Sequence, residues 1–276
     1  MYKKYLVVAS KLDRAGINIT TALSQFRQNP VISSIGDKPN FDFYLLEKEI
    51  IDDSGIDKNK INKYDFVIFA SKHESSKKEK TLSVHSPGNW RNNQLGGEQG
   101  KVCPSSALFQ KQLFENLNGI AKKYEADSKY NITLEATHHG PLIEKPCVFI
   151  EIGSTDTEWN DRKAAFVIAK TISETIENFK ENPYNEIAIG IGGPHYCPNF
   201  NKIQSKSNVA LSHIIPQYSL PLTKEMLKEA IEKTEEEVDF VVLDWKSLGN
   251  SEQRQQVLSI LEELYLQYKR TGEVDK

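Results

Sequence analysis

Residues 147–179, CVFIEIGSTDTEWNDRKAAFVIAKTISETIENF, decide the fold class. They open with a short apolar run at 147–152, which is typical of a buried strand. Thr155 and Glu158 have the spacing of a capping box, so we expect a helix to begin there. The apolar residues of that helix recur on one stripe: Ala165, Ile168, Ile172, Ile176 and Phe179. A buried strand followed directly by an amphipathic helix indicates an α/β protein.

The same alternation of strands and helices extends along the whole chain. We expect further strands at 5–9, 41–46, 66–70, 132–136, 187–191 and 238–243, and further helices at 13–26, 105–124, 224–236 and 251–268. Short apolar strands between helices favour a three-layer α/β/α arrangement around a central sheet that is mixed but largely parallel. No internal repeat and no linker divides the chain, so we expect residues 1–276 to form a single catalytic unit.

The composition narrows the possible functions. The chain has 276 residues, of which 38% are hydrophobic and 26% charged, as in ordinary soluble proteins. No apolar run approaches the ~18 residues of a membrane span, and the N-terminal run is too short for a signal peptide. We therefore expect a cytoplasmic protein with no membrane partner. Its three cysteines form no CxxC pair, which disfavours a disulfide framework and a thiolate zinc knuckle.

The overall charge argues against nucleic-acid binding, whereas one local segment favours it. The net charge of −3 argues against a protein that binds nucleic acid over a broad surface. Residues 72–104, however, form a long polar excursion that we expect to face the substrate, since loops of that length are usually functional or disordered. Within 72–101 six basic residues outnumber three acidic ones. Trp90 lies beside Asn89 there and is a candidate stacking platform for an unpaired base, although a Trp90 folded back onto the core fits equally well.

Histidines gather at the predicted strand ends. His73 follows the strand at 66–70, and His195 follows the strand at 187–191. His138 and His139 follow the strand at 132–136. Ligands of open α/β sheets bind beyond the carboxyl ends of the strands, so we expect these side chains to share a site. The alternative is that each is an ordinary turn histidine.

Glu151 ends the apolar strand that opens the quoted stretch, and His85 lies within the polar excursion. A carboxylate beside histidines can bind a metal, act as a general base or orient an imidazole. Alternatively, Glu151 merely stabilises the start of a helix. Adjacent Gly192 and Gly193 precede His195, and their amide N–H groups are candidate oxyanion donors. No GxSxG or HExxH motif is present, which disfavours a serine hydrolase and a zincin.

Five short motifs together resemble the D-aminoacyl-tRNA deacylases of the archaeal and plant type, over nearly the whole chain. They are Ser71-Lys-His73, Thr81-Leu-Ser-Val-His-Ser-Pro-Gly-Asn-Trp90, Thr137-His-His-Gly-Pro141, Phe149-Ile-Glu-Ile-Gly-Ser-Thr155 and Gly190-Ile-Gly-Gly-Pro-His-Tyr196. Two positions depart from the family pattern. Cys197 stands where we expect a small residue other than cysteine, and Ser212 stands where we expect a glycine before His213.

The resemblance implies hydrolysis of the ester that joins a D-amino acid to the 3′-terminal ribose of tRNA, with broad side-chain tolerance. It also implies a Zn²⁺ requirement and a phosphorylase/hydrolase-like fold. The expected partner is a tRNA acceptor end that carries a D-amino acid, and we expect a monomer. The candidate catalytic residues are His138, His139, Glu151 and His195, and the candidate zinc ligands among them are His139, Glu151 and His195. The candidate substrate-binding residues are Ser71, His73, His85, Asn89, Trp90, Gly192 and Gly193.

Three other functions stay open on the sequence alone. A zinc-dependent metallopeptidase or amidohydrolase on a similar scaffold would use the same histidines and glutamate, but the Trp90 excursion would then lack a role. A nucleoside phosphorylase would need an arginine-rich phosphate site, and none of the six arginines lies in the histidine motifs. A non-catalytic tRNA-binding module would not need histidines at several strand ends.

Overall fold

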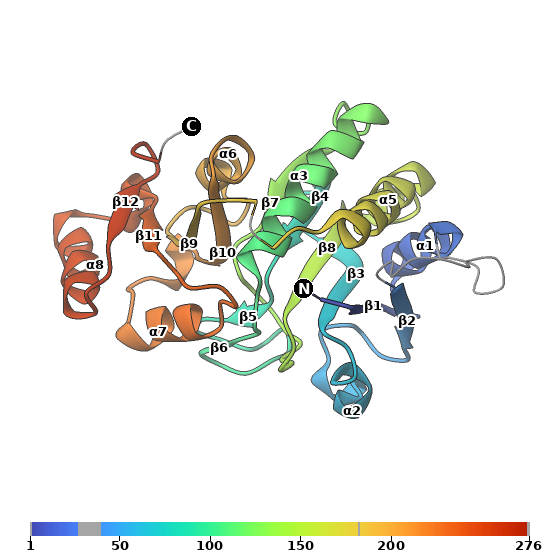
Figure 1. Cartoon of the computed structure of the whole chain (residues 1–276), viewed down its shortest axis with the longest axis horizontal. Helices are drawn as coiled ribbons and strands as arrows, with labels where there is room; N and C mark the ends of the chain where they lie inside the picture. The colour runs from blue at the N-terminus through green and yellow to red at the C-terminus, as the bar shows by residue number, and fades with distance from the viewer. Residues whose placement is uncertain (1, 27–39, 182, 275–276) are drawn as a thin grey trace.

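A computed structural model describes residues 2–26, 40–181 and 183–274. Its strands form a six-stranded sheet in the order β2-β1-β3-β8-β4-β7 and a four-stranded sheet in the order β10-β9-β11-β12 (Figure 1). The strands of the larger sheet are β1 (Lys4–Ser10), β2 (Asn40–Leu46), β3 (Phe66–Glu74), β4 (Thr81–His85), β7 (Asn131–Leu134) and β8 (Cys147–Ser154). Those of the smaller sheet are β9 (Glu186–Ile191), β10 (Val209–Ile215), β11 (Phe240–Leu243) and β12 (Tyr268–Arg270).

Eight α-helices lie in the described part of the chain: α1 (Arg14–Leu23), α2 (Lys58–Ile61), α3 (Ala107–Lys123), α4 (Asp156–Trp159), α5 (Arg162–Asn178), α6 (Pro198–Lys206), α7 (Lys224–Glu232) and α8 (Ser251–Glu263). A short antiparallel ribbon, β5 (Gly88–Asn89) with β6 (Lys101–Val102), lies apart from the sheets. Within the two sheets every neighbouring pair of strands is parallel except β4 and β8. The predicted α/β fold with a mixed, largely parallel sheet is therefore confirmed.

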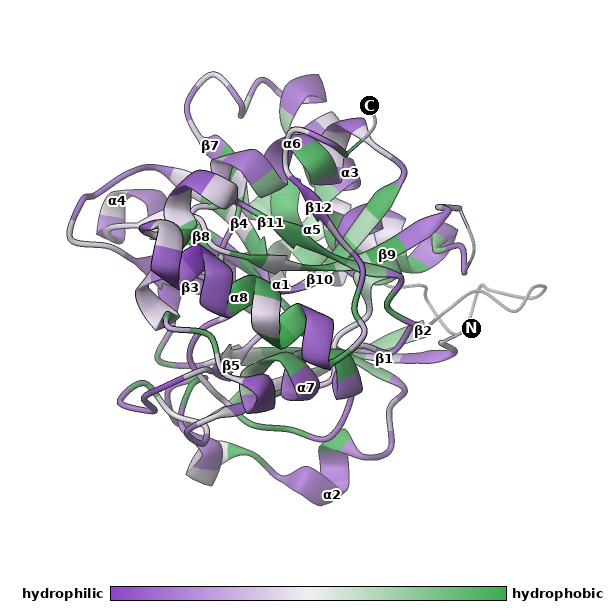
Figure 2. Ribbon diagram, turned by 90° about the vertical axis from the view of Figure 1, so that its left-hand side faces the viewer, coloured by the Kyte–Doolittle hydropathy of each residue, from purple (hydrophilic) through white to green (hydrophobic). Residues whose placement is uncertain are grey.

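Alternating side chains give the strands of the larger sheet two buried faces. On β1, Tyr5 and Val7 pack into the core cluster that α1, α3 and α5 cover, whereas Leu6 and Val8 pack on the opposite side with Ile61 of α2. The smaller sheet packs its outer face against α7 and α8. Figure 2 shows this burial, with hydrophobic green concentrated on the strands and polar purple on the outward sides of the helices. Among the described helices, none combines the length and the apolar character that a membrane span needs.

Several element boundaries differ from the predictions. Residues 72–104 are not one polar loop, because β3 continues to Glu74 and β4 lies inside the larger sheet. The predicted capping box is also wrong: the Thr155 hydroxyl bonds the Glu158 side chain instead of a backbone N–H, and only the single turn α4 follows. The long helix α5 begins after Asp161, whose carboxylate accepts the N–H groups of Lys163 and Ala164.

The C-terminal elements differ for a tertiary reason. The predicted helix at 251–268 ends at Glu263, because the residues after it pair with β11 as strand β12. Residues 194–215, which show little periodicity, contain helix α6 and the fully buried strand β10. Pairing partners distant in sequence decide both cases, which periodicity within a short window does not register.

Candidate active site

The carboxyl ends of strands from both sheets meet at one place, and backbone hydrogen bonds hold them together. The N–H of Ala136, just beyond β7, donates to the carbonyl of His195 at 2.8 Å. The N–H of Thr137 donates to the carbonyl of Ile214 in β10 at 3.1 Å. These bonds join the segment after β7 to the segment after β9, so histidines from the two sheets become neighbours.

Five histidines form a continuous cluster there. The ring of His138 lies 4.2 Å from that of His85, 4.3 Å from that of His139 and 4.6 Å from that of His195, between centroids. His73 stacks on His195 at 5.6 Å. The structure thus brings together all five histidines that the sequence analysis selected. The sixth, His213, packs against Trp90 elsewhere in the core.

Glu135 lies at the centre of this cluster, and the sequence analysis missed it. Its Oε1 is 3.2 Å from Nδ1 of His73, and its Oε2 is 3.4 Å from Nε2 of His138 and 3.2 Å from Nε2 of His195. The side chain is fully buried. The available signal was an acidic residue in the strand predicted at 132–136, three residues before a histidine pair.

Glu151 is the second buried carboxylate. It lies on β8, between Ser71 of β3 and Ser83 of β4 in the strand register. The Ser71 hydroxyl donates to its Oε1. Its Oε2 lies 3.4 Å from Nε2 of His85 and 3.7 Å from Nδ1 of His73. Both carboxylates therefore contact the histidine cluster from adjacent parts of the larger sheet.

Their environments shift the two carboxylates in opposite directions. Burial and the negative charge of Glu135 raise the pKa of Glu151 to about 7. Burial also acts to raise the pKa of Glu135, but its contact with His195 and the charges of His73 and His85 outweigh this and lower it to about 2. Such a divergence between neighbouring acids is typical of active sites.

The histidines divide in the same way. Burial lowers the pKa of His85 and of His139 to about 4, and it lowers the pKa of His138 well below its ordinary value. Burial acts to lower the pKa of His195 too, but its contact with Glu135 outweighs burial and leaves that pKa raised. Of His85, His138, His139 and His195, the last is thus the one that carries a proton most readily.

The cluster has the donor chemistry of a metal site. Both oxygens of Glu135, Oε2 of Glu151 and Nε2 of His85 are buried and make no hydrogen bond of standard geometry within the described chain. Such groups are costly to bury unless a cation or donor satisfies them. The residues whose donor atoms lie within 4.8 Å of one another form three sets: His73, Glu135, His138 and His195; His85, His138 and His139; and His85, Glu135 and Glu151.

The predicted zinc ligands His139, Glu151 and His195 are divided among these three sets. His195 belongs with Glu135, and His139 belongs with His85 and His138. The three predicted ligands therefore do not share one set, and Glu135 takes part in two of the sets.

Two predicted substrate-binding residues of the polar excursion serve the fold instead. Trp90 is only 5% exposed and belongs to the core of the smaller sheet, where its indole N–H donates to the Ile214 carbonyl at 3.3 Å. It is therefore not an exposed stacking platform. Asn89 is also buried, and its amide donates to the Gly96 carbonyl at 2.7 Å.

The predicted oxyanion donors are engaged as well. The Gly192 N–H donates to the Ile215 carbonyl at 2.8 Å, and the Gly193 N–H donates to the Ser247 hydroxyl at 2.6 Å. Their φ angles of +99° and +77° make the sharp turn that delivers His195. The two glycines thus shape the site without offering it free N–H groups.

His85 is fully buried and stacks on Phe149, so it packs the histidine cluster against the core of the larger sheet. His139 adopts a φ of +43°, a left-handed backbone conformation that residues other than glycine seldom take outside functional sites.

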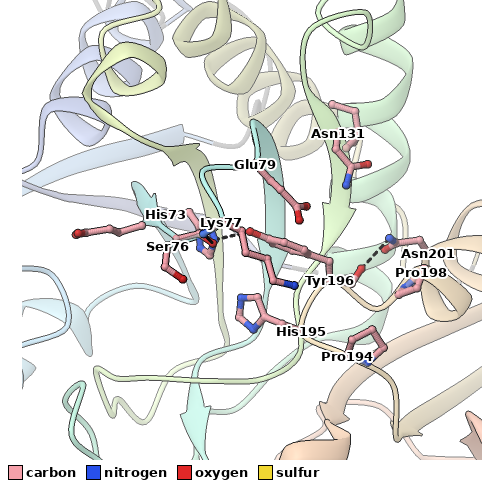
Figure 3. A pocket seen from close by; sticks show the side chains of 13 residues that line it. His73, Ser76, Lys77, Glu79, Asn131, Pro194, His195, Tyr196, Pro198 and Asn201 are labelled. Carbon is pink, nitrogen blue, oxygen red and sulfur yellow. Dashed lines mark hydrogen bonds between the residues drawn. The ribbon is translucent and has the colours of Figure 1, made fainter. Parts of the chain in front are cut away.

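Two cavities meet at the histidine cluster. The larger, about 740 Å³, is lined by Lys77, Asn131 and Tyr196 among others, and Figure 3 shows Tyr196 reaching across it toward His73. The smaller, about 320 Å³, is lined by Ser71, Glu151, His138 and His139 together with Asp13, Glu49, Ile50, Ile51 and Leu95. His73 and His195 line both cavities, so a substrate that spans the two would pass across these residues.

Comparisons with known proteins show the family of this chain. The family model described as D-aminoacyl-tRNA deacylase matches residues 60–269. A D-aminoacyl-tRNA deacylase of Thermococcus kodakarensis is 32% identical over 276 residues, covering 96% of this chain and 99% of its own. One of Methanocaldococcus jannaschii is 32% identical over 261 residues, covering 92% and 94%.

A crystal structure of a conserved protein of unknown function matches with a TM-score of 0.85 and 29% identity, covering 98% of this chain and 96% of that one. The metallopeptidase and amidohydrolase alternative finds no support in the family match. The fold, the buried Glu–His cluster and these matches agree, and the chain belongs to the D-aminoacyl-tRNA deacylase family.

Proposed function

We propose that this protein hydrolyses the ester bond of D-aminoacyl-tRNA and releases a free D-amino acid and tRNA. The observation that carries the proposal is the pair of buried carboxylates, Glu135 and Glu151, within a histidine cluster at the junction of two cavities. Ester hydrolysis needs a water that loses a proton and a leaving oxygen that gains one. A site with one acid of raised pKa and one of lowered pKa suits that demand. Its substrate is found wherever translation takes place, so we expect the protein in the cytoplasm. We also expect it to act as a monomer.

The two cavities suit the two halves of the substrate. The larger has room for the terminal adenosine, and the Tyr196 ring within it offers a face for stacking. The smaller combines aliphatic Ile50 and Ile51 with the carboxylates of Asp13 and Glu49, of which Glu49 pairs with Lys72 in the same lining at 3.6 Å. Such a lining suits an amino-acid side chain and a cationic α-ammonium group. The ester then lies between them, beside His73 and His195.

Glu151 is the group we assign to take the proton of the attacking water. It lines the smaller cavity, its Oε2 makes no hydrogen bond of standard geometry, and its raised pKa lies near the ordinary working pH. Ser71 holds the other oxygen and so fixes the direction of the carboxylate. Glu151, once protonated, is placed to give this proton to the departing ribose oxygen, while His73 and His195, which line both cavities, flank the ester.

Zn²⁺ fits the donor set at Glu135, and we propose that His73, Glu135, His138 and His195 hold it. When bound, zinc lowers the pKa of a coordinated water towards ~7 and polarises a carbonyl group. In this arrangement Ala136 assists from the backbone, because its carbonyl lies 2.8 Å from Nδ1 of His138 and thereby directs Nε2 towards Glu135.

The test is to incubate the purified protein with D-tyrosyl-tRNA and with L-tyrosyl-tRNA and to follow release of the amino acid. We expect rapid release of D-tyrosine and slow release of L-tyrosine. A protein inert towards both esters would overturn the proposal. Release of amino acids from peptides instead would favour the peptidase alternative.

A further inference from the structure

A cationic cluster around an indole ring lies at the carboxyl ends of β11 and β12. The guanidinium carbon of Arg270 is 4.0 Å from the centroid of the Trp245 ring, and that of Arg254 is 5.2 Å from it. Lys246 follows Trp245 in the chain and is exposed. We call Trp245, Lys246, Arg254 and Arg270 the Trp245 cluster. Three elements build it: the turn Trp245–Leu248, helix α8 and strand β12.

The side-chain cations of this cluster form no ion pair among the described residues, although the Glu273 carboxylate accepts the backbone N–H of Arg270 at 2.8 Å. In the described part of the chain, no carboxylate oxygen lies within 4 Å of the side-chain nitrogens of Lys246, Arg254 or Arg270. The nearby Lys269, in contrast, pairs with Glu186 at 2.7 Å. A guanidinium group that packs its face on an indole keeps its in-plane N–H groups for a second partner, and a phosphate is the partner that matches their geometry.

The cluster lies at the same edge of the smaller sheet as the turn that delivers His195. Ile191 at the end of β9 is level with Leu243 of β11, and Leu243 is level with Arg270 of β12. Strands lie ~4.8 Å apart, so Arg270 begins about 10 Å from the end of β9. The turn that carries Trp245 also accepts a hydrogen bond from Gly193, two residues before His195, through the Ser247 hydroxyl.

The basic residues of the excursion at 72–101 do not offer an equivalent surface. Arg91 donates to the carbonyls of Ser219 and Pro221, and Lys101 pairs with Glu229 at 2.9 Å. Lys72 pairs with Glu49 at 3.6 Å, and Lys80 pairs with Glu158 at 3.4 Å. Four of the six cations of this excursion thus serve contacts within the protein. In a chain of net charge −3, an RNA substrate therefore needs another local source of positive charge.

We propose that the Trp245 cluster binds backbone phosphates of the tRNA acceptor end, next to the terminal nucleotide in the larger cavity. The inference rests on the proposed function and adds to it the surface that recognises RNA. The cluster makes the enzyme favour a whole tRNA over a short aminoacyl nucleoside, because only the former reaches both places.

The test compares R254Q/R270Q with the matched variant K122Q/K163Q, which removes two cations from α3 and α5. Two substrates are used: D-tyrosyl-tRNA and 3′-O-D-tyrosyl-adenosine. For R254Q/R270Q we expect kcat/KM on the tRNA to fall about tenfold or more through KM, with a salt dependence shallower by about 1 to 2 in the log–log slope. The adenosine ester and the control variant should stay within about twofold of the unmodified protein. Equal losses on both substrates, or no loss on the tRNA, would overturn the proposal.

Binding of uncharged tRNA, measured by fluorescence anisotropy, gives a readout that does not depend on deacylation. R254Q/R270Q should weaken it about tenfold, and R254K/R270K, which keeps both charges, should restore most of it. Unchanged binding in R254Q/R270Q would refute the surface whether or not the protein deacylates its substrate. Conversely, weakened binding without any deacylation would refute the proposed function alone.

Discussion

Replacing Glu135 with glutamine tests the centre of the site with the smallest change of shape. The carboxylate contacts three imidazoles, those of His73, His138 and His195, at 3.2 to 3.4 Å. Loss of one orienting partner at a metal or catalytic histidine typically costs 10- to 100-fold. Because three histidines share Glu135, we expect kcat/KM on D-tyrosyl-tRNA to fall by about 10²- to 10⁴-fold, or roughly 3 to 5 kcal/mol of transition-state stabilisation.

The assay measures D-tyrosine release and zinc content on the same preparations. E135Q should lose zinc together with activity while its circular dichroism spectrum is retained. The matched control is E49Q, which removes a carboxylate that lines the smaller cavity and whose one ion pair among the described residues is with Lys72, at 3.6 Å. E49Q should keep its zinc. An E135Q protein with wild-type zinc content and activity within about threefold would show that Glu135 does not organise the site.

The remaining predictions concern stability, pH and metal. W90F should lower the free energy of unfolding, and W90A should lower it further, by about 3 to 5 kcal/mol, because the Trp90 ring is buried in the hydrophobic core. A W90F protein of unchanged stability with a tenfold higher KM would instead favour a stacking role. His213 has a folded-state pKa of about 4 because it is buried, so the unfolded chain binds more protons between pH 4 and pH 6.5. The contribution of neutral His213 to the free energy of unfolding is therefore lost as pH falls, by about 2 kcal/mol at pH 5. Urea titrations of H213Q should show a free energy of unfolding that depends less on acid pH. Identical pH profiles for H213Q and the wild type would refute this. Dialysis against a strong chelator should abolish deacylation, and added zinc should restore it, whereas full activity without metal would leave only a metal-free mechanism.

The histidine cluster was predictable because it follows from topology. Parallel strands point their carboxyl ends to one edge, and His73, His138, His139 and His195 each follow a strand that is legible as an apolar run. The family resemblance rested on the same segments. Glu151 was selected as the end of an apolar run, although β8 continues to Ser154 and Glu151 lies within it.

The other features depend on partners that lie far away in sequence. Strand β4 contains Thr81 and Ser83, and these polar residues do not predict a buried strand. The strand is fully buried because β7 and β8 flank it. Whether the Gly193 N–H is free depends on Ser247, 54 residues away. Glu135 was missed because a charged residue in an apolar strand predicts an exposed position. Its contacts with three histidines come from segments that are distant in sequence.

The most direct test of the account is a single-turnover measurement of D-tyrosine release from D-tyrosyl-tRNA by the wild-type protein and by E135Q/E151Q. The account predicts complete release by the wild type and release at the spontaneous rate of the ester by the double variant, which should remain folded. Release by the folded double variant at the wild-type rate would contradict the claim that these two buried carboxylates and their histidines perform the hydrolysis.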